Sequence, residues 1–157
     1  MTPTFMAQEI AEIPAAIAAC LRENAPRQDA LAQALRAFDP QLVITVARGS
    51  SDHAGLFAKY LFEVELGLPT FAAAPSVTTV YQRALHLQGV LVIAISQSGK
   101  SPDIVMQAQR AREQGALTVA LVNDTASPLA QTVEHCIPLH AGVEQSVAAT
   151  KSYITTL

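Results

Sequence analysis

The chain has 157 residues, of which half are apolar and 15% are charged, and its formal net charge at neutral pH is -3. This length and composition are typical of one globular domain with a substantial core, and they exclude a disordered chain. The acidic balance, the absence of Trp and the scarcity of aromatic residues argue against a nucleic-acid partner.

The sequence predicts a cytoplasmic protein that does not interact with membranes. No apolar run is long enough to span a bilayer, and the acidic N-terminus does not resemble a signal peptide. Cys20 and Cys136 lie far apart, match no metal or redox spacing, and are expected to be free structural thiols. No metal and no cofactor are predicted.

Residues 1–40 are predicted to form an N-terminal helical segment. Apolar residues recur at steps of three and four, as one face of an amphipathic helix requires: Met6, Ile10, Ile13, Ile17 and Leu21. Pro14 is expected to kink or split this helix. A second helix is predicted over 29–38 and should end before Pro40. These apolar residues exceed what one sheet face needs, so the segment is expected to pack against a partner.

Residues 41–157 are predicted to form one α/β domain. Continuous apolar strands at 42–47, 89–96 and 116–124 alternate with helices at 52–66, 76–85 and 102–114, and shorter strands are expected at 69–74 and 135–140. Another helix is predicted to open near residue 144. Strands that are apolar on both faces indicate a doubly wound parallel sheet of about five strands with helices on both faces, of flavodoxin-like or Rossmann-like type.

Ligands bind such sheets outside the carboxyl ends of the strands, so the loops there are informative. Three of them are rich in Gly, Ser and Thr: "RGSSDHAG" (48–55), "SQSGKSPD" (96–103) and "AGVEQSVAATK" (141–151). Small hydroxyl residues at helix starts hold anions because they add O–H donors to the free backbone N–H groups. The same edge of the sheet is therefore predicted to bind an anionic ligand.

The ending Gly99-Lys100-Ser101 resembles that of a nucleotide-binding P-loop, but Ala94 stands where the first glycine belongs. Ala94 lies inside an apolar strand, so the remaining loop, 96–101, is too short to encircle a diphosphate. It suits one phosphate held at a helix start, with Ser101 and Pro102 as N-cap and first residue. An ATPase remains an alternative, because "LTVALVND" (117–124) could pass for a Walker B strand.

These three loops, in this order, resemble the sugar isomerase (SIS) domain family, and "FMAQEIAEIP" (5–14) resembles the segment before the isomerase part of glucosamine-6-phosphate synthases. The resemblance implies aldose–ketose isomerisation of a hexose or amino sugar 6-phosphate with ammonia release or addition, as in stand-alone deaminase/isomerases. It also implies a homodimer, or pairing with a second SIS domain that supplies catalytic groups. This chain would then be the first SIS domain of a longer one. A non-catalytic sugar-phosphate sensor is the alternative, although the acidic N-terminal helix is unlike a DNA-binding segment.

The resemblance also implies roles for individual residues. Ser96, Gln97, Ser98 and Ser101 would bind the 6-phosphate; Gly49, Ser50 and Ser51 would contact sugar hydroxyls or the phosphate rim; and Val147 and Ala149 would line the sugar pocket. Glu144 would sit at the mouth, as a weak candidate for the catalytic base. Lys100, Ala149 and Arg48 depart from the synthase pattern, and two added positive charges near the phosphate could favour an anionic sugar.

Other side chains have competing interpretations. Lys151 is either a solvated lysine or a contact to ligand or to the second half, and Glu144 is either a helix N-terminal charge or a pocket residue. Ser51-Asp52-His53 is not expected to work as a hydrolase triad, because adjacent residues at a helix start point in different directions.

Overall fold

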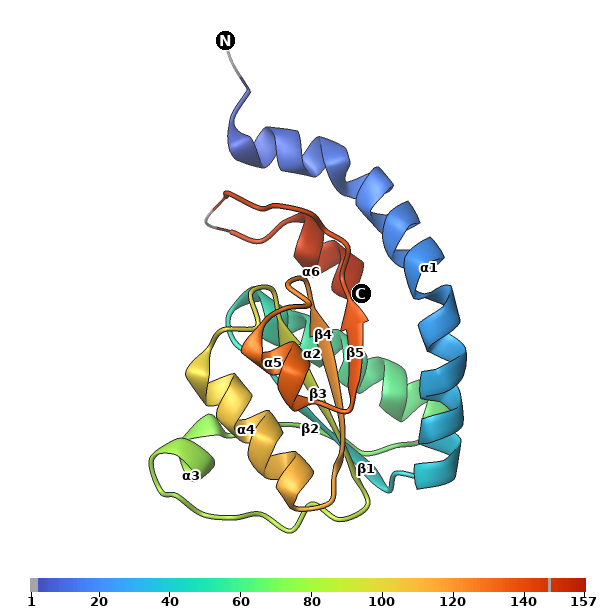
Figure 1. Cartoon of the computed structure of the whole chain (residues 1–157), viewed down its shortest axis with the longest axis vertical. Coiled ribbons are helices and arrows are strands. Elements are labelled where there is room, and N and C mark those ends of the chain that lie inside the picture. Colours follow the sequence, from blue (N-terminus) through green and yellow to red (C-terminus); the bar gives the residue numbers. More distant parts are fainter. Residues whose placement is uncertain (1–2, 147) are drawn as a thin grey trace.

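The computed structural model describes residues 3–146 and 148–157, and its centre is a parallel five-stranded sheet (Figure 1). The strand order is β2-β1-β3-β4-β5. The strands are β1 (Leu42–Val46), β2 (Thr70–Ala72), β3 (Val90–Ser96), β4 (Leu117–Val122) and β5 (His135–Pro138). The predicted fold class, a doubly wound α/β sheet of five strands, is confirmed.

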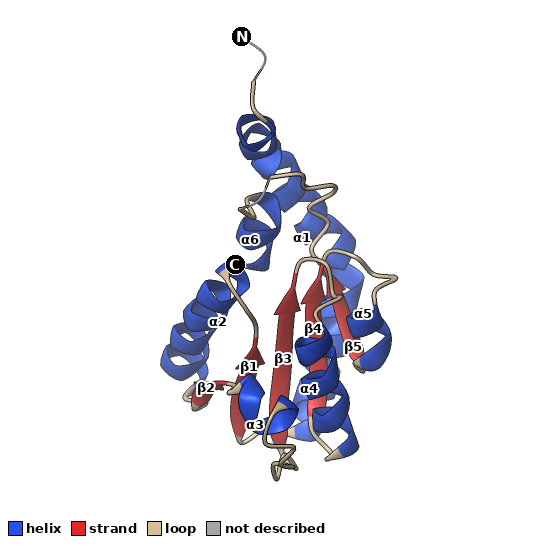
Figure 2. Cartoon of the chain, turned by 90° about the vertical axis from the view of Figure 1, so that its left-hand side faces the viewer, coloured by secondary structure: helices blue, strands red, loops and turns tan. Residues whose placement is uncertain are grey.

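Helices cover both faces of the sheet (Figure 2). On one side lie α3 (Pro75–Thr79), α4 (Pro102–Glu113) and α5 (Pro128–Thr132), and on the other α1 (Phe5–Phe38), α2 (Ser50–Leu61), the π-helix η1 (Phe62–Leu66) and α6 (Lys151–Thr156). Successive residues of β3 alternate between the two cores: Val92 and Ala94 pack on the α4 side, and Leu91 and Ile93 on the α1 and α2 side. Burial on both faces explains why β3 is apolar throughout.

The N-terminal segment is one helix, α1, and not the two helices expected from the sequence. The helix continues through Pro14 and Pro26, and it follows a curved path around the sheet (Figure 1). Leu35 and Phe38 pack into the core, and the side-chain amide of Asn24 donates to the Pro138 carbonyl at 2.7 Å. These contacts hold the second half of α1, including the region of Pro26, against the sheet. The predicted boundary at residue 40 falls in the loop before β1, and a division into two units remains a prediction.

Two predicted helices have different limits. The helix expected at 76–85 covers only Pro75–Thr79, and a left-handed Gln82 follows. The last helix begins at Lys151 and not near residue 144. The helix predicted at 52–66 is present as α2 and η1 over 50–66. The sequence pattern places five of its apolar residues on the core side, but all five are exposed: Leu56, Phe57, Tyr60, Leu61 and Val64.

Within residues 3–146 and 148–157, no helix is both long enough and apolar enough to cross a bilayer.

Candidate functional site

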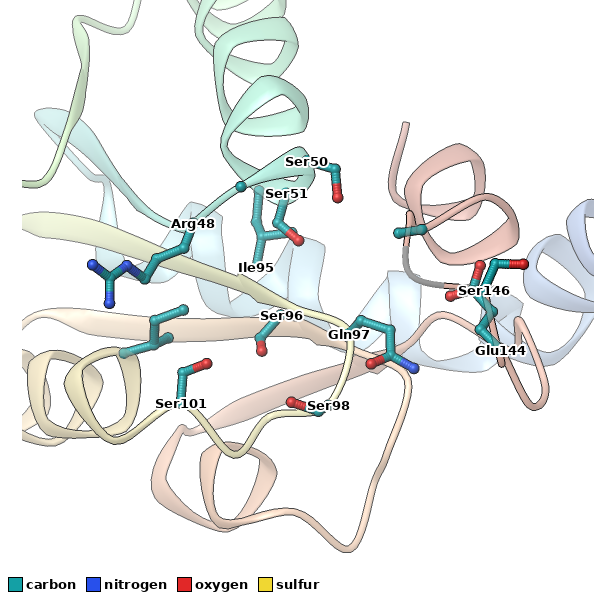
Figure 3. Close-up of a pocket in the computed structure, with 13 residues that line it drawn as sticks. Arg48, Ser50, Ser51, Ile95, Ser96, Gln97, Ser98, Ser101, Glu144 and Ser146 are labelled. Carbon is teal, nitrogen blue, oxygen red and sulfur yellow. The ribbon is translucent and has the colours of Figure 1, made fainter. Parts of the chain in front are cut away.

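A cavity of about 380 Å³ opens at the carboxyl ends of β1 and β3 (Figure 3). In the sheet, β2 lies on one side of β1 and β3 lies on the other, so the strand order reverses between β1 and β3. This position is the topological switch point, where such sheets bind ligands. The cavity is lined by residues from three loops: Arg48, Gly49, Ser50, Ser51, Ser96, Gln97, Ser98, Ser101, Glu144, Ser146 and Ala149, with Ile95 and Ile104. The three loops predicted from the sequence therefore meet at one site.

Every predicted binding residue that the structure describes lies on this cavity. Val147 falls outside the described residues. Whether these residues bind a ligand remains a prediction. Ser146 and the two isoleucines were not predicted, although Ser146 belongs to the Ser-rich loop that was.

Two hydrogen bonds of Gly99 fix the position of the loop between β3 and α4. The Gly99 N–H donates to the Ser96 hydroxyl at 3.0 Å, and its carbonyl accepts from the Leu129 N–H at 3.1 Å. Gly99 has a φ of +63°, and a Cβ added there would come within 2.1 Å of the Ser127 Oγ. Only glycine fits both the left-handed backbone and the close approach to Ser127. Ala94 is fully buried in β3, as expected, so the loop begins too late for a P-loop.

The two helices that begin at the cavity, α2 and α4, have no side-chain cap. Ser101 is the N-cap residue of α4, and Gly49 that of α2, but neither helix has a side-chain capping bond. Simple helix capping therefore does not explain Ser101. Ser51, Ser96, Ser98 and Ser101 surround the opening of the cavity in Figure 3. Two helix N-termini and several hydroxyls facing one space make a suitable environment for a phosphate.

The two extra cations are both neutralised within the chain. Arg48 lines the cavity, but its guanidinium pairs with Asp103 at 3.0 Å and is directed away from the serine side chains (Figure 3). Lys100 does not line the cavity, because its ammonium pairs with Asp124 at 3.1 Å and holds the pKa of that carboxyl below its usual value. Lys100 thus forms an exposed ion pair outside the cavity. In a P-loop the lysine would reach the phosphates, so this geometry also argues against a nucleotide site.

The third wall of the cavity comprises residues 144–146 and 148–150, and two carboxylates hold it in place. Glu144 Oε1 accepts the N–H groups of Thr150 at 2.8 Å and Ser152 at 3.2 Å, at the start of α6. Glu9, from α1, accepts the N–H groups of Gln145 and Ser146. The Thr150 N–H thus bonds a carboxylate and not a helix carbonyl four residues earlier, and α6 starts later than the sequence predicted. Glu144 is therefore both a helix N-terminal charge and a residue of the cavity.

The pKa of Glu144 lies below its usual value of 4.5. Burial alone would raise this pKa, but the hydrogen bonds from Ser152 and Thr150 together outweigh it. A carboxylate stabilised in this way is a weak base, which does not suit proton abstraction near neutral pH.

Glu144→Gln should lower the free energy of unfolding at pH 7 by about 1 kcal/mol, because partial exposure screens the lost charge. The lowered pKa of Glu144 means that its stabilisation is fully present above pH 4.5 and is lost as the pH falls through the lower folded value. Urea unfolding of both proteins between pH 7 and pH 3 measures this effect. A difference that grows toward low pH would contradict it.

Lys151 is a buried structural residue, which neither sequence interpretation anticipated. Its side chain is 3% exposed, and its ammonium pairs with Glu12 of α1 and donates to the Val143 carbonyl at 2.9 Å. Burial of an ammonium group requires such partners. α1 thus contacts the third wall through two carboxylates, Glu9 and Glu12.

The other polar clusters are separate from the cavity. Ser51 faces it, whereas Asp52 and His53 line a different hollow beside α2. In the part of the chain that the structure describes, His, Cys, Asp and Glu side chains form no group of three that could hold a metal ion.

The fold and the cavity define an α/β domain of flavodoxin-like strand order with a candidate anion site at its switch point. A model of the SIS domain family matches residues 38–157. The chain belongs to the SIS domain family, which confirms the resemblance inferred from the three loops.

Two curated relatives are glutamine–fructose-6-phosphate aminotransferases (isomerizing). The protein of Streptomyces coelicolor is 36% identical over 98% of this chain and 26% of its own length. The protein of Methanothermobacter thermautotrophicus is 37% identical over 98% of this chain and 25% of its own length. The chain thus spans about a quarter of these relatives.

Two solved structures are similar over nearly the whole chain. A protein of Silicibacter pomeroyi DSS-3, provisionally described as a phosphosugar isomerase, is 50% identical with a TM-score of 0.94, over 98% of this chain and 47% of that one. The C-terminal domain of glucosamine-fructose-6-phosphate aminotransferase from Francisella tularensis is 27% identical with a TM-score of 0.84, over 99% and 43%.

Proposed function

We propose that this domain binds a hexose or amino sugar 6-phosphate and serves an enzyme that interconverts aldose and ketose forms with ammonia release or addition. The observation that carries the proposal is the cavity at the switch point, where Ser51, Ser98 and Ser101 meet two helix N-termini. The relatives named as aminotransferases and phosphosugar isomerases support the same substrate class.

In this proposal the domain holds the phosphate and leaves proton transfer to other groups. Moving a proton between C1 and C2 needs a base with a pKa near neutrality, and binding of the remote phosphate positions the reacting carbons. The lowered pKa of Glu144 supports a structural role for that carboxylate. We assign the base to a second SIS domain or to a partner subunit.

A partner of this kind would cover two apolar surfaces. Ile10 and Leu21 of α1 are exposed, as are Leu56, Tyr60 and Val64 on the far side of α2 and η1. The partner would be a second SIS domain, in the same chain or in a second copy. The free thiols, Cys20 and Cys136, suit the reducing cytoplasm in which we place the protein.

Calorimetric titration with glucosamine 6-phosphate, with Mg-ATP as the competing ligand, tests the proposed binding. We expect binding of the sugar phosphate, and Ser98→Ala should weaken it about tenfold, because one hydroxyl contact to a charged phosphate is lost. Ser76→Ala, on exposed α3 and away from the cavity, is the matched control and should bind as the original does.

Binding of Mg-ATP alone would overturn the sugar-phosphate proposal and restore the P-loop alternative. Equal weakening by Ser98→Ala and Ser76→Ala would show that the cavity is not the binding site. Failure of both ligands to bind would contradict the proposal that this domain binds a sugar phosphate.

A further inference from the structure

Glu9 is a buried charged residue of α1, and it does not line the cavity. Its side chain is 5% exposed, although it carries a carboxylate. Both oxygens contact the third wall: Oε1 accepts the N–H groups of Gln145 and Ser146, and Oε2 accepts the Thr150 hydroxyl at 3.4 Å. A buried carboxylate is costly unless hydrogen bonds compensate it, so these contacts account for its position.

The two backbone donors that meet Glu9 are successive residues of the chain. Successive N–H groups that converge form a concavity that binds an anion, and here the anion is a side chain of the same protein. Without Glu9, the N–H groups of Gln145 and Ser146 would lose their acceptor, which is unfavourable in a partly buried loop. Glu9 therefore fixes the backbone that carries Glu144, Ser146 and Ala149 to the cavity.

A second carboxylate of α1 secures the residues on either side of this wall. Glu12 follows Glu9 by three residues, so both lie on one face of the helix. Glu12 pairs with Lys151, whose ammonium also donates to the Val143 carbonyl. The phosphate loop has separate anchors in Ser96 and Leu129. The two sides of the cavity are thus held in place by different parts of the chain.

We propose that Glu9 is a positioning residue for the sugar side of the site. It holds Gln145 and Ser146 so that the third wall meets the sugar ring, and it does not touch the ligand. This role rests on the proposed function, because the wall has a ligand to meet only if the cavity binds a sugar phosphate. Inorganic phosphate would need only the loop of residues 96–101. Comparing its affinity with that of the sugar phosphate therefore distinguishes the phosphate side of the cavity from the sugar side.

Titration of the 157-residue chain and its variants with glucosamine 6-phosphate and with inorganic phosphate tests the role of Glu9. Glu9→Ala should weaken the sugar phosphate about tenfold, since a charge-assisted contact to the wall is lost, and leave inorganic phosphate unchanged. Glu9→Gln retains an oxygen that accepts both N–H groups, so it should recover most of the affinity. Glu23→Gln, at an exposed site on the same helix, is the matched control.

Hydrogen exchange gives a measurement that does not depend on a ligand. The amides of Gln145 and Ser146 should exchange faster in Glu9→Ala than in the original chain, while the amide of Gly99 should not change. Unchanged exchange at Gln145 and Ser146, or an equal loss of affinity for both ligands, would overturn the role of Glu9. An original chain that binds neither ligand would instead contradict the proposed function, and the exchange result would still decide whether Glu9 holds the wall.

Discussion

Gly99→Ala should lower the free energy of unfolding by about 3–5 kcal/mol, because left-handed strain and a steric overlap add together. The new methyl group would lie 2.1 Å from Ser127 Oγ and 2.8 Å from Val122 Cγ2. Both neighbours are almost completely buried, so they have little room to move. Urea denaturation measures the loss, which is a large part of the stability of a typical domain.

Gly67→Ala separates the two causes of this loss. Gly67 has a φ of +64°, nearly that of Gly99, but a Cβ added there would meet nothing within 4 Å. Gly67→Ala should therefore cost only the backbone strain, about 1 kcal/mol. Equal losses for the two substitutions would show that the contact between the loop and Ser127 does not constrain Gly99.

Ser98→Asp should abolish detectable binding of glucosamine 6-phosphate, with a loss of at least about 100-fold. The hydroxyl of Ser98 lies on the loop of the proposed phosphate site, and a carboxylate there would repel the phosphate. The loss should exceed that of Ser98→Ala, because repulsion is added to the missing hydrogen bond. Calorimetry with the sugar phosphate measures both variants.

The matched control is Ser76→Asp, which changes the net charge equally at an exposed position of α3, away from the cavity. It should leave the affinity close to that of the original chain. If Ser98→Asp bound as well as Ser98→Ala does, the phosphate would not lie at this loop. Thermal unfolding of each variant checks that both charge changes leave the fold intact.

The sheet and the loops of the site could be predicted because local patterns specify them. The continuous apolar run of β3 requires a strand that is covered on both faces, and parallel order brings the strand ends to one edge. The three Ser-rich loops could therefore be placed together from the sequence. Gly99 was recognisable as part of a motif, but its contact with Ser127 depends on how α5 packs.

The features that were missed depend on contacts between distant residues. Two separate helices were expected, one in the segment up to Leu21 and one over 29–38, whereas α1 runs from Phe5 to Phe38 without a break. Lys151 was expected to be solvated or to contact a ligand or the second half, because its true partner, Glu12, is far away in the sequence. The spacing of Leu56 and Tyr60 correctly predicted a helix, but both side chains are exposed. A periodic apolar pattern does not distinguish a face that packs on the core from a face that would bind a partner.

The contact between Glu9 and Gln145 joins residues that are 136 positions apart. Contacts of such high sequence separation form slowly, because closing a long loop costs entropy before the contact stabilises it. During synthesis, the wall of the cavity cannot form until the residues after β5 have left the ribosome, although α1 emerges before the sheet. The sheet can thus assemble before the site does, and acquisition of ligand affinity would be a late event in the folding of this domain.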